Sequence, residues 1–312
     1  MKNIILFLIC IGISNQENFI NPDVNDEDVS KYCSGENFTF YNHTPFSYII
    51  NETTLCSENV FLLTYVQSSS INFERRQLIR DTWGSLKQIN SETTRLLFII
   101  GRPSSQTDQD KIMNESKKFR DLVQADFLDT YKNLTLKHMV ALHWIHNFCP
   151  QAEFISKTDD DTFINIFSLT YFSRINLNPK EKFILGQISS NEHPIRKKGF
   201  KWTVGEDMYS PEKYPPYTKG FAYMISQAAV RPLLVCSYYE KYLFIDDVFI
   251  TGIVLQRTYV HHMNFQLNFG YIFLDKENIT ANTMDYIYIV GRNIVLPTQW
   301  EKLWDLSLKQ LL

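Results

Sequence analysis

Three consecutive aspartates, Asp159, Asp160 and Asp161, are the residues of this sequence whose chemistry is most informative. Neighbouring carboxylates repel one another, and this repulsion raises their pKa values unless a cation is present. Adjacent side chains of an extended segment point to opposite faces, so Asp159 and Asp161 would share one side. Their oxygens suit a hard cation such as Mn²⁺ or Mg²⁺. The alternative is a solvated acidic turn or a helix start, but the strand-like run at residues 152–157 favours a binding site.

A second acidic pair, Asp246 and Asp247, stands between apolar runs at residues 243–245 and 248–250. A carboxylate in apolar surroundings has a raised pKa, which suits it to accept a proton as a general base. The same pattern also fits the start of a helix, with an N-cap followed by a first-turn acid. On local grounds the two interpretations are equal, and the need for a base in a transfer reaction favours the first.

Basic residues gather at residues 73–83, a helix candidate that contains Arg75, Arg76 and Arg80. These arginines would either bind a phosphate group or a uracil edge, or form a solvated basic face. The sequence leaves both possibilities open. His143 and His146 lie three residues apart on another predicted helix, where they fit a packed or surface helix better than a metal site.

Strand-like and helix-like runs alternate along the chain and must position these residues. We predict strands at residues 60–66, 95–100, 152–157 and 183–186, helices at 73–83, 108–124 and 134–148, and a short polar junction at 126–131. Such alternation predicts an α/β fold, an open and mostly parallel sheet with helices on both faces. Ligands bind beyond the carboxyl ends of the strands in such a sheet. The triplet occupies one such end, and the polar loop at residues 67–70, which contains Ser68, occupies another.

The composition fits a folded protein of the secretory pathway. The 312 residues are 44% apolar, and the net charge of -3 comes from 31 basic and 34 acidic residues without a basic block, so nucleic acid is a poor candidate partner. The apolar run at residues 4–13 is too short for a membrane span of about 20 residues. We expect residues 1–14 to be a signal peptide or a short signal-anchor, residues 15–58 a polar stem or leader, and residues 59–312 the globular domain.

Four cysteines remain beyond the N-terminal apolar run, and they allow two bridges in three connectivities. If the strands at residues 60–66 and 152–157 are neighbours, the ends opposite the acidic triplet also meet. That arrangement brings Cys56 to Cys149, and we predict this bridge. Cys33 and Cys236 are then either free or paired. Six Asn-x-Ser/Thr sequons are candidates for glycosylation.

Five motifs occur in order between residues 60 and 257. They are Arg75-Arg76-x-x-Ile79-Arg80-x-Thr82-Trp83-Gly84, Asp126-Phe127-x-Asp129-x-Tyr131-x-Asn133-Leu134-Thr135-x-Lys137, Lys157-Thr158-Asp159-Asp160-Asp161, Tyr214-Pro215-Pro216-Tyr217 and Asp246-Asp247-Val248-Phe249. Together they resemble the β-1,3-galactosyltransferase and β-1,3-N-acetylglucosaminyltransferase family, glycosyltransferase family 31. Each motif alone is weak, but five in register are specific.

The resemblance implies a Rossmann-like GT-A fold and an inverting transfer that needs Mn²⁺ or Mg²⁺. The donor would be a UDP-sugar that carries galactose, N-acetylglucosamine or N-acetylgalactosamine. The acceptor would be a hydroxyl of a glycan on a glycoprotein or glycolipid, joined in β-1,3 linkage. The roles that the resemblance implies are metal and donor binding by Asp161 and Asp159 and general base catalysis by Asp247. We also expect donor binding by Asp160, Ser68, Arg76 and Arg80.

Two departures from the family pattern bear on these expectations. Relatives carry a full membrane anchor, whereas the apolar run here is short, so the resemblance implies the Golgi membrane or lumen, or secretion if residues 4–13 are cleaved. Many relatives also place a metal-binding histidine before a C-terminal helix, where this sequence has Gly291 ahead of Trp300 and Trp304. Gly291 keeps a second hypothesis open, a catalytically silent relative that binds glycans or assists a partner protein in the lumen.

Overall fold

One mixed β-sheet forms the centre of the molecule. The computed structural model describes residues 24–35, 38–41, 47–265, 270–274, 279–291 and 297–309. Within these ranges, nine strands form the sheet in the order β1-β5-β4-β2-β6-β9-β8-β10, with β3 paired to β4. The strands are β1 (Tyr48–Ile50), β2 (Leu62–Gln67), β3 (Gln88–Ile89), β4 (Glu92–Arg102), β5 (Leu122–Leu128), β6 (Phe154–Asp159), β8 (Phe183–Ser189), β9 (Tyr217–Ser226) and β10 (His261–Asn264). A smaller sheet has the order β11-β12-β7, formed by β11 (Tyr271–Leu274), β12 (Tyr288–Gly291) and β7 (Thr162–Ile164).

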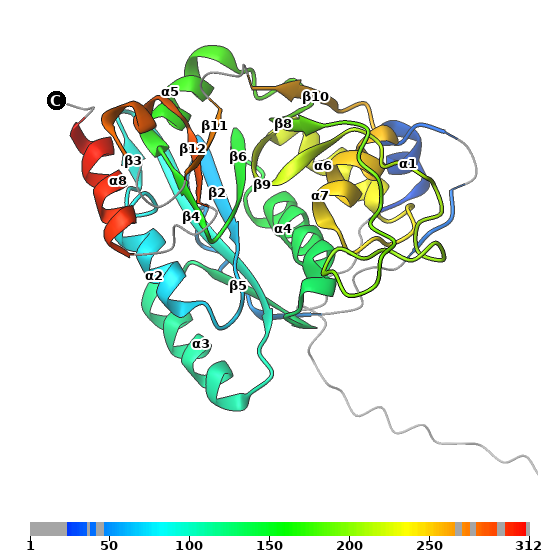
Figure 1. Ribbon diagram of the computed structural model, residues 1–312, viewed down its shortest axis with the longest axis horizontal. Helices are drawn as coiled ribbons and strands as arrows, with labels where there is room; N and C mark the ends of the chain where they lie inside the picture. Colours follow the sequence, from blue (N-terminus) through cyan, green and yellow to red (C-terminus); the bar gives the residue numbers. More distant parts are fainter. Residues whose placement is uncertain are drawn as a thin grey trace, which may run out of the picture.

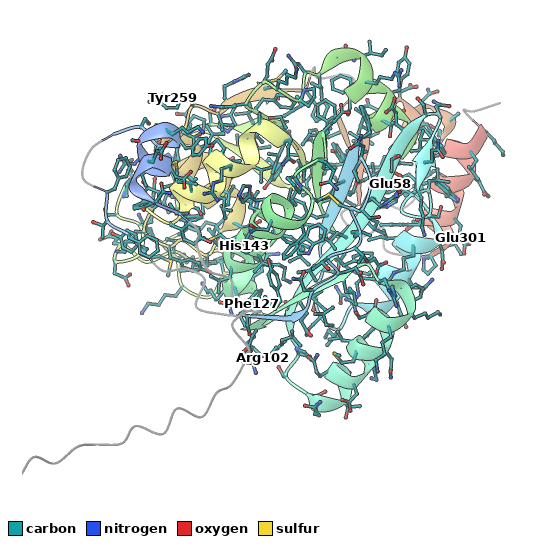
Figure 2. The ribbon with its side chains drawn as sticks, turned by 180° about the vertical axis from the view of Figure 1, so that it is seen from behind. Glu58, Arg102, Phe127, His143, Tyr259 and Glu301 are labelled. Atoms are coloured by element: carbon teal, nitrogen blue, oxygen red, sulfur yellow. A yellow bond between two sulfur atoms is a disulfide. The ribbon has the colours of Figure 1, made fainter. Side chains whose placement is uncertain are left out.

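Helices cover both faces of the large sheet, as predicted. One face carries α4 (Leu134–Phe148), α6 (Gln227–Ser237) and the short α7 (Asp246–Val248), which continues into the π-helical turn η3 (Phe249–Val254). The other carries α2 (Phe73–Asp81), α3 (Gln106–Phe119), α5 (Ile166–Asn176) and α8 (Pro297–Lys309). Figure 1 shows these two groups of helices on either side of the strands. Viewed from behind in Figure 2, Tyr259 and Glu301 mark opposite edges of the molecule.

The strands are apolar runs because both of their faces are buried. In β2, Leu63 and Tyr65 belong to the core under α4 and α6, whereas Leu62 and Val66 belong to the core under α2 and α5. This alternation is the period-two pattern of a strand that is covered on both sides. The predicted α/β class and the strand-helix alternation are therefore confirmed.

The register of β2 and β6 sets the position of the acidic triplet. These strands are parallel neighbours, and Gln67, the last residue of β2, pairs with Asp159, the last residue of β6. The predicted adjacency of the two carboxyl ends is thus confirmed. At the opposite ends, Cys56 and Cys149 form a disulfide with a Cα–Cα distance of 5.3 Å. The predicted bridge is also confirmed.

The region after α3 differs from its prediction. The helix expected at residues 108–124 ends at Phe119, and Arg120 follows with a left-handed φ of 53°. Leu122 and Val123 then begin β5, whose residues fill both cores, so the first half of the polar junction expected at residues 126–131 is strand. The prediction was wrong because this short strand follows a polar helix without a glycine or proline between them.

The described part of the expected leader packs against the domain. α1 (Asp26–Tyr32) lies beside α6, and Cys33 forms a disulfide with Cys236 of α6. Arg231 also contacts Asp28 at 2.8 Å. Residues 15–58 are therefore not a loose stem throughout. The signal peptide or anchor expected at residues 1–14 lies outside the described residues, and in the ranges that the structure describes no helix has the length and apolarity to cross a bilayer.

Candidate active site

A cleft of about 650 Å³ opens at the carboxyl ends of β2 and β6. Its volume lies within the range of small-molecule sites, roughly 300–1,000 Å³. The acidic triplet forms one wall, and Asp246 and Asp247 form another. Other residues that line it include Gln67, Tyr131, Lys157, Glu192, Tyr217 and Lys219. The two acidic motifs singled out from the sequence therefore share one site.

The three aspartates of the triplet divide between two sides, as their spacing predicts. The Asp160 side chain is 8% exposed, whereas those of Asp159 and Asp161 are 41% and 44% exposed. Asp160 is held by three donors from the loop after β2 and from α2: Ser68 Oγ at 2.8 Å, Asn72 Nδ2 at 2.8 Å and Arg75 Nη1 at 2.9 Å. Asp160 therefore anchors the triplet, and Asp159 and Asp161 keep oxygens available to a ligand.

The electrostatics of the two exposed carboxylates favour a cation. Burial raises the pKa of Asp159 to about 7, Lys157 opposes this rise, and the charge of Asp161 adds to it. The pKa of Asp161 is also raised, by burial first and then by Asp160. Water in the open cleft moderates both effects. A bound cation would remove the repulsion between these carboxylates.

Arg76 binds residues 68–70, the loop after β2, and does not line the cleft. Its side chain is fully buried. Its partners are Glu115 Oε1 (2.8 Å), Glu115 Oε2 (2.7 Å), Ser69 O (2.6 Å), Ser70 O (3.1 Å) and Ser68 Oγ (3.2 Å). These contacts use all five N–H groups of the guanidinium. The structure therefore does not bring Arg76 to the cleft, and Arg76 contacts Ser68 instead.

Arg80 lies away from the cleft as well. It contacts Asp121 at 2.7 Å and Glu115 at 2.8 Å, and its guanidinium stacks 4.0 Å from the ring centroid of Phe119. It lines a second cavity, of about 640 Å³, beneath the carboxyl ends of α2 and α3. The structure thus does not bring Arg80 to the acidic triplet. Both arginines pair with acids that lie about 40 positions further along the chain, which the local helical pattern does not reveal.

A second motif fixes the same loop. Lys137 of α4 is buried, and its Nζ donates to Ser68 O at 2.6 Å and to Asp129 Oδ1 at 2.8 Å. Asp129 Oδ2 in turn accepts from the backbone N–H of Ser70 at 3.0 Å and of Gly101 at 2.9 Å. Arg76 and Lys137, from two different sequence motifs, therefore both hold residues 68–70 in place beside the triplet.

Asp246 and Asp247 have opposite pKa shifts although they are adjacent. Burial alone would raise the pKa of Asp246, but Lys157, 4.0 Å away, and His138, at 3.2 Å, outweigh it and lower the pKa to about 2. Burial and the charge of Asp246 raise the pKa of Asp247 to about 7. Asp247 Oδ2 accepts from the backbone N–H of Gly220 at 3.0 Å, which fixes its orientation. Paired acids with pKa values pushed apart are typical of a structural anion next to a general base.

His138 is a residue of the site that the sequence analysis missed. It is fully buried on α4, and its ring lies between Asp246 Oδ2 at 3.2 Å and the hydroxyls of Tyr65 at 3.0 Å and Tyr223 at 3.2 Å. Burial lowers the pKa of His138, and its contact with Asp246 opposes this effect. A histidine inside an otherwise apolar helix was the available signal. The histidine weighed there, His143, packs against the Tyr48 hydroxyl at 2.8 Å, in line with its expected packed role.

Gly291 lies next to the acidic triplet. β12 pairs with β7 so that Val290 is opposite Thr162, which directly follows Asp161. Gly291 follows Val290 and ends β12. Over the described ranges, no cluster of three or more His, Cys, Asp or Glu side chains is arranged to hold a metal ion. Asp159 and Asp161 stay the predicted protein ligands of a cation at this site.

Known proteins resemble this chain over the region that holds the site. A sequence profile described as Galactosyltransferase matches residues 74–266, which contain every motif from Arg75 to Asp247. Beta-1,3-galactosyltransferase 5 of Gorilla gorilla gorilla is 37% identical over 197 residues, 63% of this chain and 65% of the relative, so the match spans slightly less than two thirds of that relative. Beta-1,3-galactosyltransferase 1 of Mus musculus is 29% identical over 285 residues, 88% of this chain and 85% of the relative. A crystal structure of the galactosyltransferase LgtC with donor and acceptor sugar analogs aligns with a TM-score of 0.40 and 7% identity, covering 80% of this chain and 96% of LgtC.

Proposed function

The chain belongs to the galactosyltransferase family, and from that membership we propose that it is an inverting glycosyltransferase of the GT-A type. It moves a hexose, galactose, N-acetylglucosamine or N-acetylgalactosamine, from a UDP-sugar to a glycan hydroxyl in β-1,3 linkage. One observation carries the proposal. The acidic triplet and Asp247, a carboxylate with a raised pKa, face the same cleft at the carboxyl ends of parallel strands.

Asp247 is the general base of the proposed reaction. Its carboxylate removes the proton of the acceptor hydroxyl while the oxygen attacks the anomeric carbon, and the bond from that carbon to the UDP oxygen breaks in the same step. Attack opposite the leaving group inverts the anomeric centre. A pKa of about 7 supports this role, because a base works best when its pKa is close to the working pH.

Asp159 and Asp161 would hold a divalent cation, Mn²⁺ or Mg²⁺. Their fit rests on hard carboxylate oxygens, on raised pKa values that a cation would relieve, and on an open cleft in which donor phosphates complete the coordination. When bound, the cation supplies Lewis-acid stabilisation of the leaving diphosphate. Ser68 and Asp160 position the triplet, and Arg76 positions Ser68. Lys157 contacts Asp159 at 2.7 Å and opposes the rise in the pKa of that carboxyl.

We place this activity in the Golgi lumen, with glycoprotein or glycolipid glycans as acceptors. Two disulfides, Cys33–Cys236 and Cys56–Cys149, support an oxidising compartment. Residues 1–14, which would supply a signal peptide or a short anchor, lie outside the described ranges.

The proposal is tested by UDP release from UDP-galactose, UDP-N-acetylglucosamine and UDP-N-acetylgalactosamine with a panel of glycan acceptors. We expect one donor to turn over in a Mn²⁺-dependent way, and Asp161→Ala to lose both turnover and Mn²⁺-dependent UDP binding. Asp126→Ala is the matched control, because Asp126 is exposed and pairs with Arg102 away from the cleft. If no donor turned over, and wild type and Asp161→Ala bound UDP equally, the chain would be a silent glycan-binding relative instead.

A further inference from the structure

The loop between β8 and β9 brings an aromatic side chain to the mouth of the cleft. Ile195, Lys201 and Trp202 of this loop line the cleft that also contains the triplet. Trp202 is 43% exposed, although large aromatic side chains usually bury most of their surface. An exposed indole in the wall of a binding cleft is apolar surface that a ligand can cover.

This loop is held in place by its own hydrogen bonds. The backbone N–H of Val204 donates to Ile195 O at 2.9 Å, and Thr203 Oγ1 donates to Lys197 O at 2.7 Å. Arg196 spans the loop, with Nη1 to Val204 O and Nη2 to Pro211 O, both at 3.0 Å. The loop segment that carries Trp202 is therefore braced by hydrogen bonds on both sides of the ring's attachment point.

Lys201 contacts the rings of both Trp202 and Tyr131, which also lines the cleft. Its ammonium lies 4.3 Å from the ring centroid of Trp202 and 5.3 Å from that of Tyr131, which precedes α4. The pKa of Tyr131 is raised, by burial first and then by the charges of Asp246 and Asp247. Tyr131 and Trp202 thus line the cleft that also contains Asp247.

Polar side chains line the same cleft beside Asp247. Glu192 Oε1 accepts from Ser189 Oγ at 2.8 Å and from Lys219 Nζ at 3.1 Å, and Lys219 precedes Gly220, whose N–H binds Asp247. A sugar ring beside the base would meet these polar groups with its hydroxyls. A second ring, one residue outward, would meet aromatic surface. Pyranose rings carry C–H groups on a face, which pack on aromatic surface, and hydroxyls on the edge, which bind polar side chains.

We propose that Trp202, with Tyr131, binds the sugar residue next to the one that is glycosylated, so that the acceptor is a glycan chain of at least two residues. This inference rests on the proposed function, because it assigns the outer acceptor subsite of the same cleft. Trp202 acts as a specificity-determining residue and takes no part in proton transfer.

The test compares a monosaccharide acceptor, methyl β-N-acetylglucosaminide, with the disaccharide in which that residue is joined to galactose. We expect Trp202→Ala to lower kcat/KM for the disaccharide about tenfold, or about 1.4 kcal/mol, and to leave kcat/KM for the monosaccharide and KM for the donor within twofold. Trp202→Phe retains most of the disaccharide preference. Phe200→Ala is the matched control, since Phe200 is 49% exposed on the same loop but does not line the cleft.

Equal losses for both acceptors, or equal effects of Trp202→Ala and Phe200→Ala, would overturn the inference. Saturation-transfer NMR of the disaccharide, with UDP and Mn²⁺ present, separates this inference from the proposed function. Wild-type binding that Trp202→Ala abolishes supports the subsite even if no sugar is transferred, in which case only the proposed function fails. Transfer without any disaccharide preference in wild type contradicts the subsite alone.

Discussion

Replacing Asp246 by asparagine should move the pH dependence of transfer. Asp246 is the largest electrostatic cause of the raised pKa of Asp247, after burial. Asparagine keeps the size of the side chain and removes its charge. It also leaves Lys157, which already lowers the pKa of Asp247, without its Asp246 partner. Both changes favour the ionised form of Asp247.

The size of the shift follows from the pKa of Asp247. This pKa rises from 3.8 to about 7, and burial is the largest cause, followed by the charge of Asp246. Loss of the Asp246 charge should therefore lower it by about 1 unit, or about 1.4 kcal/mol. A general base acts as the carboxylate, so activity is lost as the pH falls through its pKa. The acid limb of the profile should thus move from about pH 7 to about pH 6 in Asp246→Asn, with a lower plateau because the base is weaker.

The assay is kcat/KM for sugar transfer between pH 5 and 9, at saturating Mn²⁺, for wild type and Asp246→Asn. Asp126→Asn serves as the control, because it removes an exposed charge that pairs with Arg102 at 2.6 Å outside the cleft. An acid limb that stayed in place or moved to higher pH in Asp246→Asn would refute the assignment of Asp247 as a base whose pKa depends on Asp246.

Three further predictions concern the stability of the site and the fold. Asp247→Asn should raise the free energy of unfolding by about 1 kcal/mol at pH 8, because a carboxylate with a raised pKa destabilises the fold once it ionises above its unfolded pKa. Urea unfolding should show no such gain near pH 3, where the carboxyl is protonated, and a gain that persisted there would point to another cause. Arg76→Met should lower the free energy of unfolding by about 3 kcal/mol, since it breaks a buried ion pair and leaves the carbonyls of Ser69 and Ser70 without this donor. A loss below about 1 kcal/mol in urea unfolding, with unchanged KM for the donor, would show that Arg76 does not hold the loop. Cys56→Ser combined with Cys149→Ser should lower the free energy of unfolding by about 3 kcal/mol, because the bridge closes a loop of 93 positions and so restricts the unfolded chain. Equal stability of this variant and oxidised wild type would contradict this prediction.

The sequence predicted the centre of the fold because its strands follow simple rules. β2 and β6 are buried on both faces, so they read as strands, and each ends in polar residues. Parallel neighbours align their carboxyl ends, which placed the triplet beside residues 67–70 and also paired Cys56 with Cys149. These features depend only on short apolar runs of sequence and on the rule that neighbouring parallel strands end at the same edge of the sheet.

Features that depend on distant partners were not predictable in the same way. Arg76 and Arg80 looked like a donor-binding face, but Glu115 and Asp121 bury them, and no local pattern links these positions. Likewise, His138 gains its role only because α4 passes behind Asp246. The local period of α2 and α4 indicates helices in both cases, and it carries no information about which side chains meet across the fold.

The most direct test of the central claim, that Asp247 is the base beside a donor and metal site, is a comparison of transfer and UDP binding in wild type and Asp247→Asn. Our account predicts Mn²⁺-dependent transfer by wild type, with unchanged UDP affinity but a kcat lower by roughly 10²–10⁴ in Asp247→Asn. Near-normal transfer by Asp247→Asn would contradict it, since the proton of the acceptor would then leave through another group.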